Sequence, residues 1–151
     1  MRYQTETREE TQRLGQALAR ALRAGDVLLL SGELGAGKSE LARGIARGLG
    51  VEGPVPSPTF TLLNIYEEGR VALHHFDWYR ADDPEEISAA GLEEYIQGEW
   101  ISLIEWHERA PYLCPERHLL VEIRALDGDT RQITLSPQGG FRDLELREEY
   151  I

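Results

Sequence analysis

The amino-acid sequence predicts an α/β protein in which helices pack on a mixed β-sheet. Three observations support this prediction. A continuous apolar run at residues 27–31 leads through a glycine-rich turn into a helical pattern, as in a βα unit. Later apolar runs alternate with short helical patterns. Two pairs of these runs are joined by brief polar turns, which adds antiparallel hairpins to the parallel strands.

The length and composition suit one domain that covers residues 1–151. Hydrophobic residues make up 41% of the chain and charged residues 28%, which is ordinary for a globular protein. No apolar run approaches the roughly 20 residues that a membrane helix needs, and the first residues lack a signal-peptide pattern. We therefore expect a cytoplasmic protein without membrane contact.

Cys114 is the only cysteine in the chain. A single cysteine excludes an internal disulfide and a Cys-rich zinc site. No neighbouring His or Asp pattern indicates a catalytic thiol, so we expect Cys114 to be inert.

The net charge of −11 lies entirely in the second half of the chain. Residues 1–75 hold nine Lys or Arg against nine Asp or Glu, whereas residues 76–151 hold seven Arg against eighteen carboxylates. Affinity for a phosphate backbone rests on cations, so the chain is a poor autonomous nucleic-acid binder. Any contact with RNA is expected to go through another subunit. A solvated acidic surface that favours solubility is an alternative explanation for most of these charges.

Two helices are expected around the glycine-rich turn. The first runs from about Glu9 to Leu22, because leucine and alanine recur there at helical spacing, and either Thr5 or Thr7 can cap it. The second helix is expected at residues 38–47 and ends at the glycines that follow.

The turn between them reads Gly-Glu-Leu-Gly-Ala-Gly-Lys-Ser from Gly32 to Ser39, which is the pattern of a phosphate-binding P-loop. Its glycines let successive N–H groups face an anion, and the helix that follows adds the positive end of its dipole. Lys38 is expected to reach the β- and γ-phosphates, and the Ser39 hydroxyl to bind Mg²⁺. Lys38 is also the only lysine among 16 basic residues, which fits a site that needs a compact ammonium ion. The motif therefore indicates a P-loop NTPase fold.

A proline-rich loop follows the second helix at residues 53–59. Its three prolines exclude a helix and favour an extended, stiff segment. Ser57, Thr59 and Thr61 supply hydroxyls of the kind found in the switch segments of P-loop proteins. The loop is either such a switch beside the γ-phosphate or a plain connector.

Residues 60–66 and 71–76 are expected to form an antiparallel hairpin. The second strand leads into Asp77, and an apolar strand that ends in Asp is the Walker B arrangement, which holds a carboxylate near Mg²⁺. His74 and His75 alternate across this strand, so they cannot share a metal ion. We expect one of them in the core and the other on the surface.

A second carboxylate follows a later strand. Asp83 and Pro84 begin a short helix, and residues 100–104 then form a strand that leads into Glu105 and Trp106. Glu105 either binds Mg²⁺ or orients the attacking water, unless it is simply a surface residue at the end of a strand. Trp106 is either a core residue or an exposed stacking platform.

The C-terminal part predicts a connector, a hairpin and a tail. Residues 107–113 are expected to contain one helical turn at most, and residues 118–124 and 131–135 to form the second hairpin. Arg131 lies either near a nucleotide base or, as we favour, on the surface. Residues 139–151 form a charged tail that is mobile or docks a partner.

Several of these motifs coincide in order and spacing. They are the P-loop, Ser57-Pro58-Thr59-Phe60-Thr61-Leu62, His75-Phe76-Asp77-Trp78-Tyr79-Arg80, Asp83-Pro84-Glu85-Glu86 and Glu105-Trp106. In this combination the chain resembles the bacterial TsaE family, small P-loop ATPases required for the N6-threonylcarbamoyladenosine modification at position 37 of tRNA (t6A37). The resemblance extends from the first helix through Glu108 and more loosely through the second hairpin. His107 departs from it, because many members have proline at this position.

The resemblance implies a three-layer fold with a mixed sheet of about seven strands, and it implies ATP or ADP and Mg²⁺ as cofactors. It assigns nucleotide binding to Gly32, Glu33, Leu34, Gly35, Ala36, Gly37, Lys38, Ser39 and Thr59, with Thr59 at the switch position. It assigns metal binding to Ser39, Asp77 and Glu105, where Ser39 replaces the family's usual threonine. The implied catalytic residues are Lys38, Asp77 and Glu105, and Trp106 is the candidate partner contact.

The resemblance also implies an ATP hydrolase that is weak alone, is activated by the TsaB–TsaD heterodimer and resets that complex between cycles. TsaD, not the TsaE-like protein, transfers the threonylcarbamoyl group, and tRNA is met through the complex. Three other functions share the P-loop: a small-molecule kinase, a nucleotide-responsive binding module and an autonomous ATPase. Against the kinase, the region from Arg80 to Arg109 contains only those two arginines, whereas such kinases usually bring several on a mobile lid.

Overall fold

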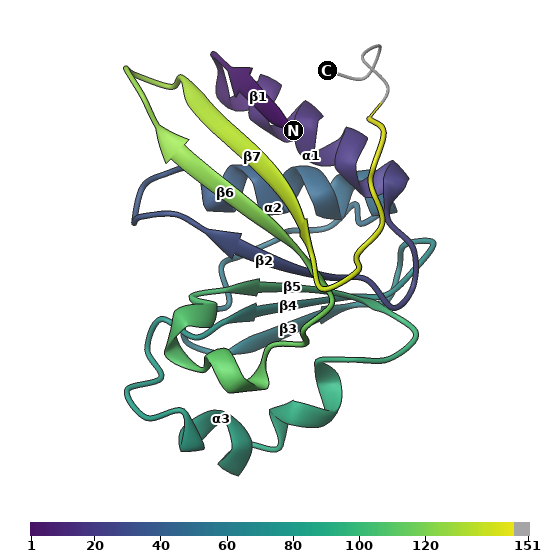
Figure 1. Cartoon of the computed structure of the whole chain (residues 1–151), viewed down its shortest axis with the longest axis vertical. Coiled ribbons are helices and arrows are strands. Elements are labelled where there is room, and N and C mark those ends of the chain that lie inside the picture. Colours follow the sequence, from purple (N-terminus) through teal and green to yellow (C-terminus); the bar gives the residue numbers. More distant parts are fainter. Residues whose placement is uncertain (147–151) are drawn as a thin grey trace.

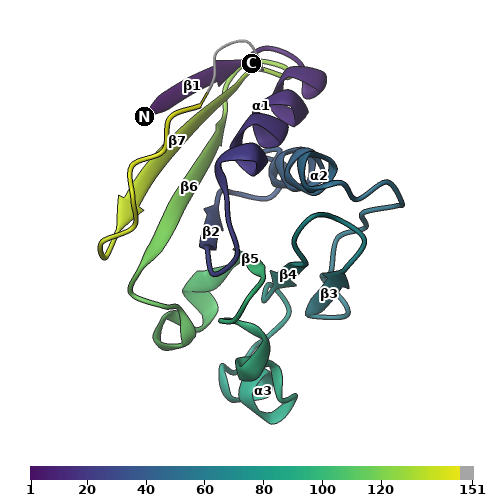
Figure 2. The same ribbon diagram turned by 90° about the vertical axis from the view of Figure 1, so that its right-hand side faces the viewer.

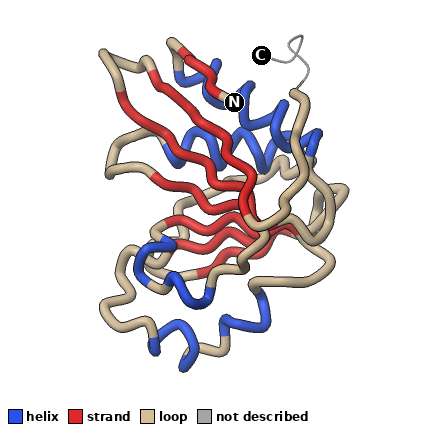
Figure 3. The backbone as a smooth tube through the Cα atoms, viewed as in Figure 1, coloured by secondary structure: helices blue, strands red, loops and turns tan. Residues whose placement is uncertain are grey.

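The computed structural model describes residues 1–146, which form one seven-stranded sheet with helices packed against it (Figures 1 and 3). The strands are β1 (Arg2–Thr5), β2 (Val27–Ser31), β3 (Leu63–Tyr66), β4 (Leu73–Asp77), β5 (Ile101–Glu105), β6 (His118–Ala125) and β7 (Arg131–Gln138). The helices are α1 (Arg8–Ala21), α2 (Lys38–Leu49) and α3 (Glu85–Ala89), with short 3₁₀ turns η1 (Leu92–Tyr95), η2 (His107–Arg109) and η3 (Pro111–Leu113). Within the described residues, no helix is both long and apolar enough to cross a membrane.

The strands lie in the order β1-β7-β6-β2-β5-β4-β3 across the sheet. The neighbours β6, β2, β5 and β4 are parallel, whereas β3 is antiparallel to β4, and β7 is antiparallel to both β6 and β1. The predicted mixed sheet and its two hairpins are therefore confirmed. Because β2, β4 and β5 are parallel, their carboxyl ends meet at one edge of the sheet, where the residues that follow them lie close together.

Helices cover the middle strands on both faces and the β6–β7 side on one face. α1 and α2 lie together on one face (Figure 2), while α3 and the 3₁₀ turns bury the apolar side chains of the other. Residues 27–30 of β2 are all buried, as expected for a strand covered on both faces. In β6 the buried residues alternate, namely Leu119, Val121 and Ile123. The three-layer arrangement thus applies to the middle of the sheet.

α1 begins at one of the two caps that the sequence predicts. The Thr7 hydroxyl accepts a hydrogen bond from the N–H of Glu10 at 3.1 Å, and the Glu10 carboxylate accepts one from the N–H of Glu6 at 2.6 Å. Leu14 and Leu18 on its inner face are buried in the same core cluster as the apolar face of α2. This packing holds α2, whose first residue belongs to the P-loop.

Three features of the fold differ from the sequence prediction. The sequence analysis does not predict β1, because its four residues become a strand only through pairing with β7. β3 begins at Leu63 rather than at residue 60, since the N–H of Leu62 donates to the carbonyl oxygen of Pro58 at 2.8 Å and closes a turn. The connector at residues 107–113 contains two 3₁₀ turns instead of one at most.

His74 and His75 are both buried, so the prediction of one core and one surface histidine is wrong. Successive strand residues point to opposite faces, and β4 lies where the sheet is covered on both faces. His74 stacks on Trp100 with ring centroids 4.2 Å apart, and its Nδ1 donates to the carbonyl oxygen of Tyr95 at 2.8 Å. His74 therefore ties the η1 segment to the sheet.

The beginning of the predicted tail packs onto the core. Phe141 and Leu144 are buried, and Arg142 forms a bidentate ion pair with Asp26 in which both N···O distances are 2.8 Å. Up to residue 146 the tail is therefore part of the fold. The remainder of the predicted tail, residues 147–151, lies outside the described residues.

Replacing Arg142 with alanine is expected to lower the free energy of unfolding by about 2–4 kcal/mol, because the buried Asp26 carboxylate loses its main cation. Arg117 forms a longer ion pair with Asp26, with Nη2 at 3.9 Å, but makes no hydrogen bond to it and would offset only part of the loss. Urea unfolding followed by circular dichroism measures the change. The control is Arg8→Ala, since the exposed pair of Arg8 and Asp129, 3.8 Å apart, is expected to contribute less than about 1 kcal/mol. Equal losses in the two variants would contradict the prediction.

Candidate active site

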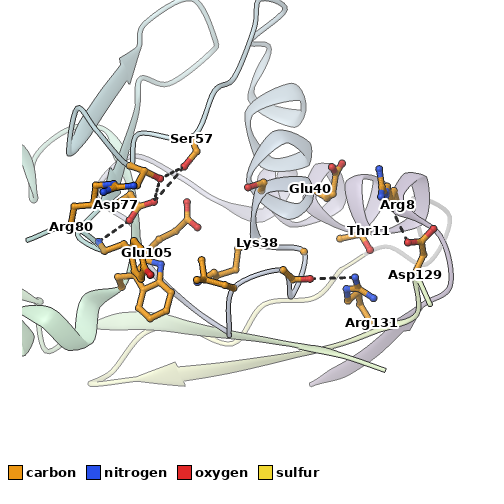
Figure 4. Close-up of a pocket in the computed structure, with 17 residues that line it drawn as sticks. Arg8, Thr11, Lys38, Glu40, Ser57, Asp77, Arg80, Glu105, Asp129 and Arg131 are labelled. Carbon is orange, nitrogen blue, oxygen red and sulfur yellow. Dashed lines mark hydrogen bonds and ion pairs between the residues drawn. The ribbon is translucent and has the colours of Figure 1, made fainter. Parts of the chain in front are cut away.

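A cavity of about 500 Å³ opens at the edge of the sheet where β2, β4 and β5 end (Figure 4). Its lining consists of Arg8, Thr11, Leu34, Gly35, Gly37, Lys38, Ser39, Glu40, Ser57, Thr59, Asp77, Tyr79, Arg80, Glu105, Trp106, Asp129 and Arg131. Figure 4 shows two distinct ends, with Asp77 and Glu105 at one, Arg8 and Asp129 at the other, and Lys38 between them. The cavity is therefore elongated, with carboxylates at one end.

The P-loop joins β2 to α2 and lines the middle of this cavity. Gly35 and Gly37 have φ angles of 79° and 101°, in the left-handed region that other residues rarely adopt. Gly37 is the N-cap of α2 and supplies no side-chain hydrogen bond, so the first N–H groups of this helix have no capping side chain. An anion is the partner that such a helix start favours.

Lys38 is held between a carbonyl oxygen and an aromatic ring. Its side chain is buried, its Nζ donates to the carbonyl oxygen of Gly32 at 2.6 Å, and the same atom lies 4.0 Å from the centroid of the Trp106 ring. Burial lowers the pKa of Lys38, while the negative charges of Glu105 and Asp77 act to raise it. The ammonium group thus carries a desolvation cost that a bound anion would offset.

Asp77 is oriented by the proline-rich loop and by its own strand end. Its Oδ1 accepts from the N–H of Tyr79 at 2.9 Å, and its Oδ2 accepts from the hydroxyls of Thr59 at 2.9 Å and Ser57 at 3.4 Å. Thr61 lies outside this group, because its hydroxyl donates to the Asn64 side chain at 2.9 Å. The proline-rich loop is therefore linked directly to the Asp77 carboxylate.

Glu105 lies opposite Asp77 in the parallel register of β4 and β5. Its side chain is buried, lines the cavity, and accepts a hydrogen bond at Oε2 from Nε2 of His75 at 2.5 Å. A solvated surface glutamate would not have this environment, so the alternative of a surface residue is wrong. Two carboxylates from adjacent strands therefore face the same cavity.

Trp106 forms a wall of the cavity beside Lys38. Its backbone has φ 58°, and within residues 1–146 only Leu62 among the other non-glycine residues has a positive φ. The indole lies 4.8 Å from the Tyr79 ring, between centroids, and packs on the core cluster beneath α3. The ring is half-buried, because it packs on the core and also lines the cavity, so it is neither a fully buried core residue nor an exposed platform.

Arg131 lies at the partly exposed surface, as favoured from sequence, and it links the P-loop to the β6–β7 turn. Its Nη1 donates to the carbonyl oxygens of Gly128 at 2.7 Å and Thr130 at 2.9 Å, and its Nη2 donates to that of Gly35 at 3.4 Å. Arg131 also lines the cavity. The side chain thus connects two segments that are far apart in sequence.

The sequence matches a known family over most of its length. The family profile for threonylcarbamoyl adenosine biosynthesis protein TsaE matches residues 5–133. The chain belongs to the TsaE family. A relative from Nostoc sp., named tRNA threonylcarbamoyladenosine biosynthesis protein TsaE, is 43% identical over 134 residues, which are 86% of this chain and 82% of the relative. A Bacillus subtilis protein of the same name is 37% identical over 148 residues, which are 98% of this chain and 92% of the relative.

A solved structure is similar as well. The crystal structure of YdiB from Bacillus subtilis aligns with a TM-score of 0.79 and 34% sequence identity, covering 92% of this chain and 86% of that chain. The TsaE resemblance drawn from the motifs is therefore confirmed at the level of the family.

This TsaE-family chain brings most of its predicted site residues to one cavity. Those that line it are Leu34, Gly35, Gly37, Lys38, Ser39, Thr59, Asp77, Glu105 and Trp106. Gly32, Glu33 and Ala36 do not, and they line a separate cavity of about 600 Å³ toward β6 and β7. Gly32 has a structural reason to be glycine, because a Cβ there would lie 2.7 Å from the carbonyl oxygen of Ile123.

Sequence reasoning missed residues at both ends of the cavity. Tyr79 and Arg80 belong to one of the motifs on which the TsaE resemblance rests, so the sequence did indicate that they lie near the site. Arg8, Thr11 and Asp129 had no signal, because they come from the start of α1 and the β6–β7 turn, which become neighbours only in the fold. These three residues make the end of the cavity that is remote from the carboxylates.

The oxygen atoms of Ser39, Asp77 and Glu105 are ligands of the kind that Mg²⁺ prefers. Among the described residues, no group of three or more His, Cys, Asp or Glu side chains is placed to hold an ion by itself. Mg²⁺ is usually bound through one or two carboxylates together with waters and substrate phosphates. The residues at this site therefore fit Mg²⁺ that arrives with a nucleotide.

Cys114 lies away from this cavity. Burial raises the pKa of its thiol to about 12, and the Sγ donates to the carbonyl oxygen of Ala110 at 3.7 Å. A thiol that stays protonated is a poor nucleophile, which agrees with the prediction that Cys114 is inert.

Proposed function

We propose that this TsaE-family chain is an ATPase with a P-loop NTPase fold that acts in the t6A37 modification of tRNA. One observation carries the proposal: a buried lysine, a hydroxyl at the start of α2 and two carboxylates at adjacent strand ends converge on one cavity. These groups are Lys38, Ser39, Asp77 and Glu105. They are the groups that phosphoryl transfer to water requires. The names of the Nostoc and Bacillus relatives support the part in tRNA modification.

Each group has a distinct role in the proposed reaction. Lys38 and the free N–H groups at the start of α2 bind the phosphates and offset their charge. Ser39 and Asp77 would hold Mg²⁺, and the ion would supply positive charge that offsets the charge developing on the phosphates. Glu105 orients the attacking water or completes the metal site. Trp106 and Tyr79 form an aromatic wall that limits access of bulk water to this end.

The elongated cavity suggests how the nucleotide lies. The γ-phosphate is placed beside Asp77 and Glu105, because these carboxylates serve Mg²⁺ and water. The base and ribose then extend toward Arg8, Thr11 and Asp129 at the opposite end. ATP and ADP would share this orientation and differ only at the carboxylate end, next to the proline-rich loop.

We propose the TsaB–TsaD heterodimer as the partner that stimulates hydrolysis and is reset by it, while TsaD carries out the threonylcarbamoyl transfer. Two large apolar side chains near the P-loop and the proline-rich loop support a protein partner, because Leu34 is 66% and Phe60 81% exposed. The net charge of −11 supports contact with tRNA through the complex rather than by this chain alone.

ATP hydrolysis by the purified chain, measured alone and then with TsaB–TsaD, tests the proposal. We expect slow release of phosphate that rises clearly when the heterodimer is added. Turnover that is indifferent to the heterodimer would reject the partner activation and leave an autonomous ATPase. Phosphate transfer to a small acceptor, with little release to water, would instead support a kinase.

Replacing Thr59 with alanine is expected to weaken the link between nucleotide state and partner affinity, because the Thr59 hydroxyl connects the loop to Asp77 at 2.9 Å. The wild type should bind TsaB–TsaD with different affinities in its ATP- and ADP-bound forms, and the variant should lose most of that difference. Biolayer interferometry with each nucleotide measures it. Thr61→Ala is the matched control, since the Thr61 hydroxyl bonds Asn64 instead. Equal effects of the two substitutions would contradict the switch role.

A further inference from the structure

His75 and Glu105 form a buried hydrogen-bonded pair at the carboxylate end of the candidate active site. His75 is 2% exposed and Glu105 4% exposed. Nε2 of His75 lies 2.5 Å from Oε2 of Glu105. Because a carboxylate oxygen only accepts hydrogen bonds, the ring N–H at Nε2 is the donor. This contact uses one carboxylate oxygen and leaves Oε1 for a different partner.

The sheet register places His75 behind the carboxylates rather than beside the substrate. His75 and Asp77 lie two residues apart on β4 and therefore share a face, and Glu105 of β5 is opposite Asp77. Glu105 and Asp77 line the cavity, whereas His75 is absent from the described residues that line it. Any influence of His75 on chemistry must therefore pass through Glu105.

The second ring nitrogen of His75, Nδ1, indicates that packing alone does not account for a histidine at this position. Its buried Nδ1 has no hydrogen-bond partner among the described residues. An unsatisfied buried nitrogen costs free energy, and an apolar side chain of similar size would avoid that cost. His74, the next residue, differs because its Nδ1 bonds Tyr95 and its ring stacks on Trp100. The hydrogen bond of the His75 side chain is the one to Glu105, whereas His74 has contacts that stabilise the fold.

We infer that His75 is a positioning residue for Glu105, which it holds with Oε1 directed at the cavity. The inference rests on the proposed ATPase function. A glutamate side chain has three rotatable bonds, and a buried carboxylate without a donor would turn toward another partner. Lys38 is one such partner, because it already lies within the field of Glu105. The His75 contact keeps the carboxylate from moving away from the water or metal position.

His75→Leu removes the donor with little change in volume, and His75→Gln keeps an N–H at a similar reach. We expect His75→Leu to lower kcat for ATP hydrolysis by about 10- to 100-fold, the range seen when a residue that orients a metal ligand is lost. The affinity for a fluorescent ADP analogue should change less than about three-fold, because Glu105 is not needed to hold the diphosphate. His75→Gln should recover at least a third of the wild-type kcat.

His74→Leu is the matched control, since it removes an equally buried histidine from the next position of β4. It should lower the melting temperature while kcat per folded molecule stays within two-fold of the wild type. A wild-type kcat in His75→Leu, or equal losses of kcat in the His74 and His75 variants, would overturn the inference. If His75→Leu does not fold, His75→Asn replaces it, because the shorter amide cannot reach Glu105. Equal kcat in His75→Asn and His75→Gln would also overturn it.

A second measurement needs neither nucleotide nor hydrolysis. A long-range ¹⁵N–¹H spectrum of the nucleotide-free protein reports which ring nitrogen of each histidine carries the proton. We expect His75 with its proton on Nε2, and we expect Glu105→Gln to shift the His75 signals while those of His74 stay in place. A proton on Nδ1 alone would overturn the inference. Absence of ATP hydrolysis by the wild type, in contrast, would reject the proposed function and leave this pairing intact.

Discussion

Replacing Lys38 with alanine is expected to reduce ATP turnover by about 10³-fold or more, because a buried positive charge that would face the transferring phosphate is removed. Lys38 is the only lysine in the chain. The other described cations that line the cavity are the arginines Arg8, Arg80 and Arg131, and none of them belongs to the P-loop. ATP affinity should also fall, since the phosphates lose a direct partner. Phosphate release in the presence of TsaB–TsaD and calorimetric titration with ATP measure the two effects.

Arg43→Ala is the control for the loss of one positive charge from α2. Arg43 pairs with Glu40 at 2.8 Å, lies outside the cavity lining, and should be replaceable with little effect on turnover. Wild-type turnover in Lys38→Ala would contradict the assignment of the P-loop lysine. A thermal melt belongs to the comparison, because Lys38 also donates to Gly32 within the fold.

The position of Lys38 explains why this loss cannot be compensated nearby. Burial lowers its pKa, so its charge is maintained at a cost that the carboxylates of Asp77 and Glu105 only partly offset. The ring of Trp106 covers the ammonium group on one side. In the proposed reaction, a phosphate that enters the cavity would replace the carbonyl oxygen of Gly32 as the partner of Lys38.

Short-range patterns predicted much of the candidate site. The P-loop, Asp77 and Glu105 can be predicted because each stands at the end of an apolar strand. The parallel register of β4 and β5 then brings the two carboxylates together. The contact of His75 with Glu105 could not be predicted from the sequence, since thirty residues separate them. A histidine in an apolar strand carries no signal of its partner.

Contacts between distant segments account for the other differences. The link from Arg131 to Gly35 could not be predicted, because 96 residues separate the two. Arg142 belongs to the segment predicted to be mobile or to dock a partner, because nothing in its neighbourhood identifies the buried Asp26 as its partner. Local periodicity indicates which residues enter a strand or helix, but it does not indicate which loops the completed fold brings together.

Replacing Gly44 with alanine is expected to lower the free energy of unfolding by about 1–3 kcal/mol, a large effect for one added methyl group. A Cβ at this position would lie 2.2 Å from the carbonyl oxygen of Gln12, so the backbones of α1 and α2 would have to separate. The higher helix propensity of alanine offsets only about 1 kcal/mol of this steric cost. Gly15 and Gly48 also lie where α1 and α2 approach closely. The helices meet there largely through backbone atoms, so no flexible side chain could move to make room for the added methyl group.

Gly53→Ala is the matched control, because a Cβ at Gly53 would meet only the end of the Glu68 side chain at 3.6 Å. Its unfolding free energy should stay within about 0.5 kcal/mol of the wild type, as for most surface substitutions. Urea unfolding of both variants decides the question. A loss in Gly44→Ala no larger than in Gly53→Ala would mean that the two helices are free to move apart. The helix pair would then not be the rigid support that holds the start of α2, and with it Lys38 and Ser39, at the end of β2.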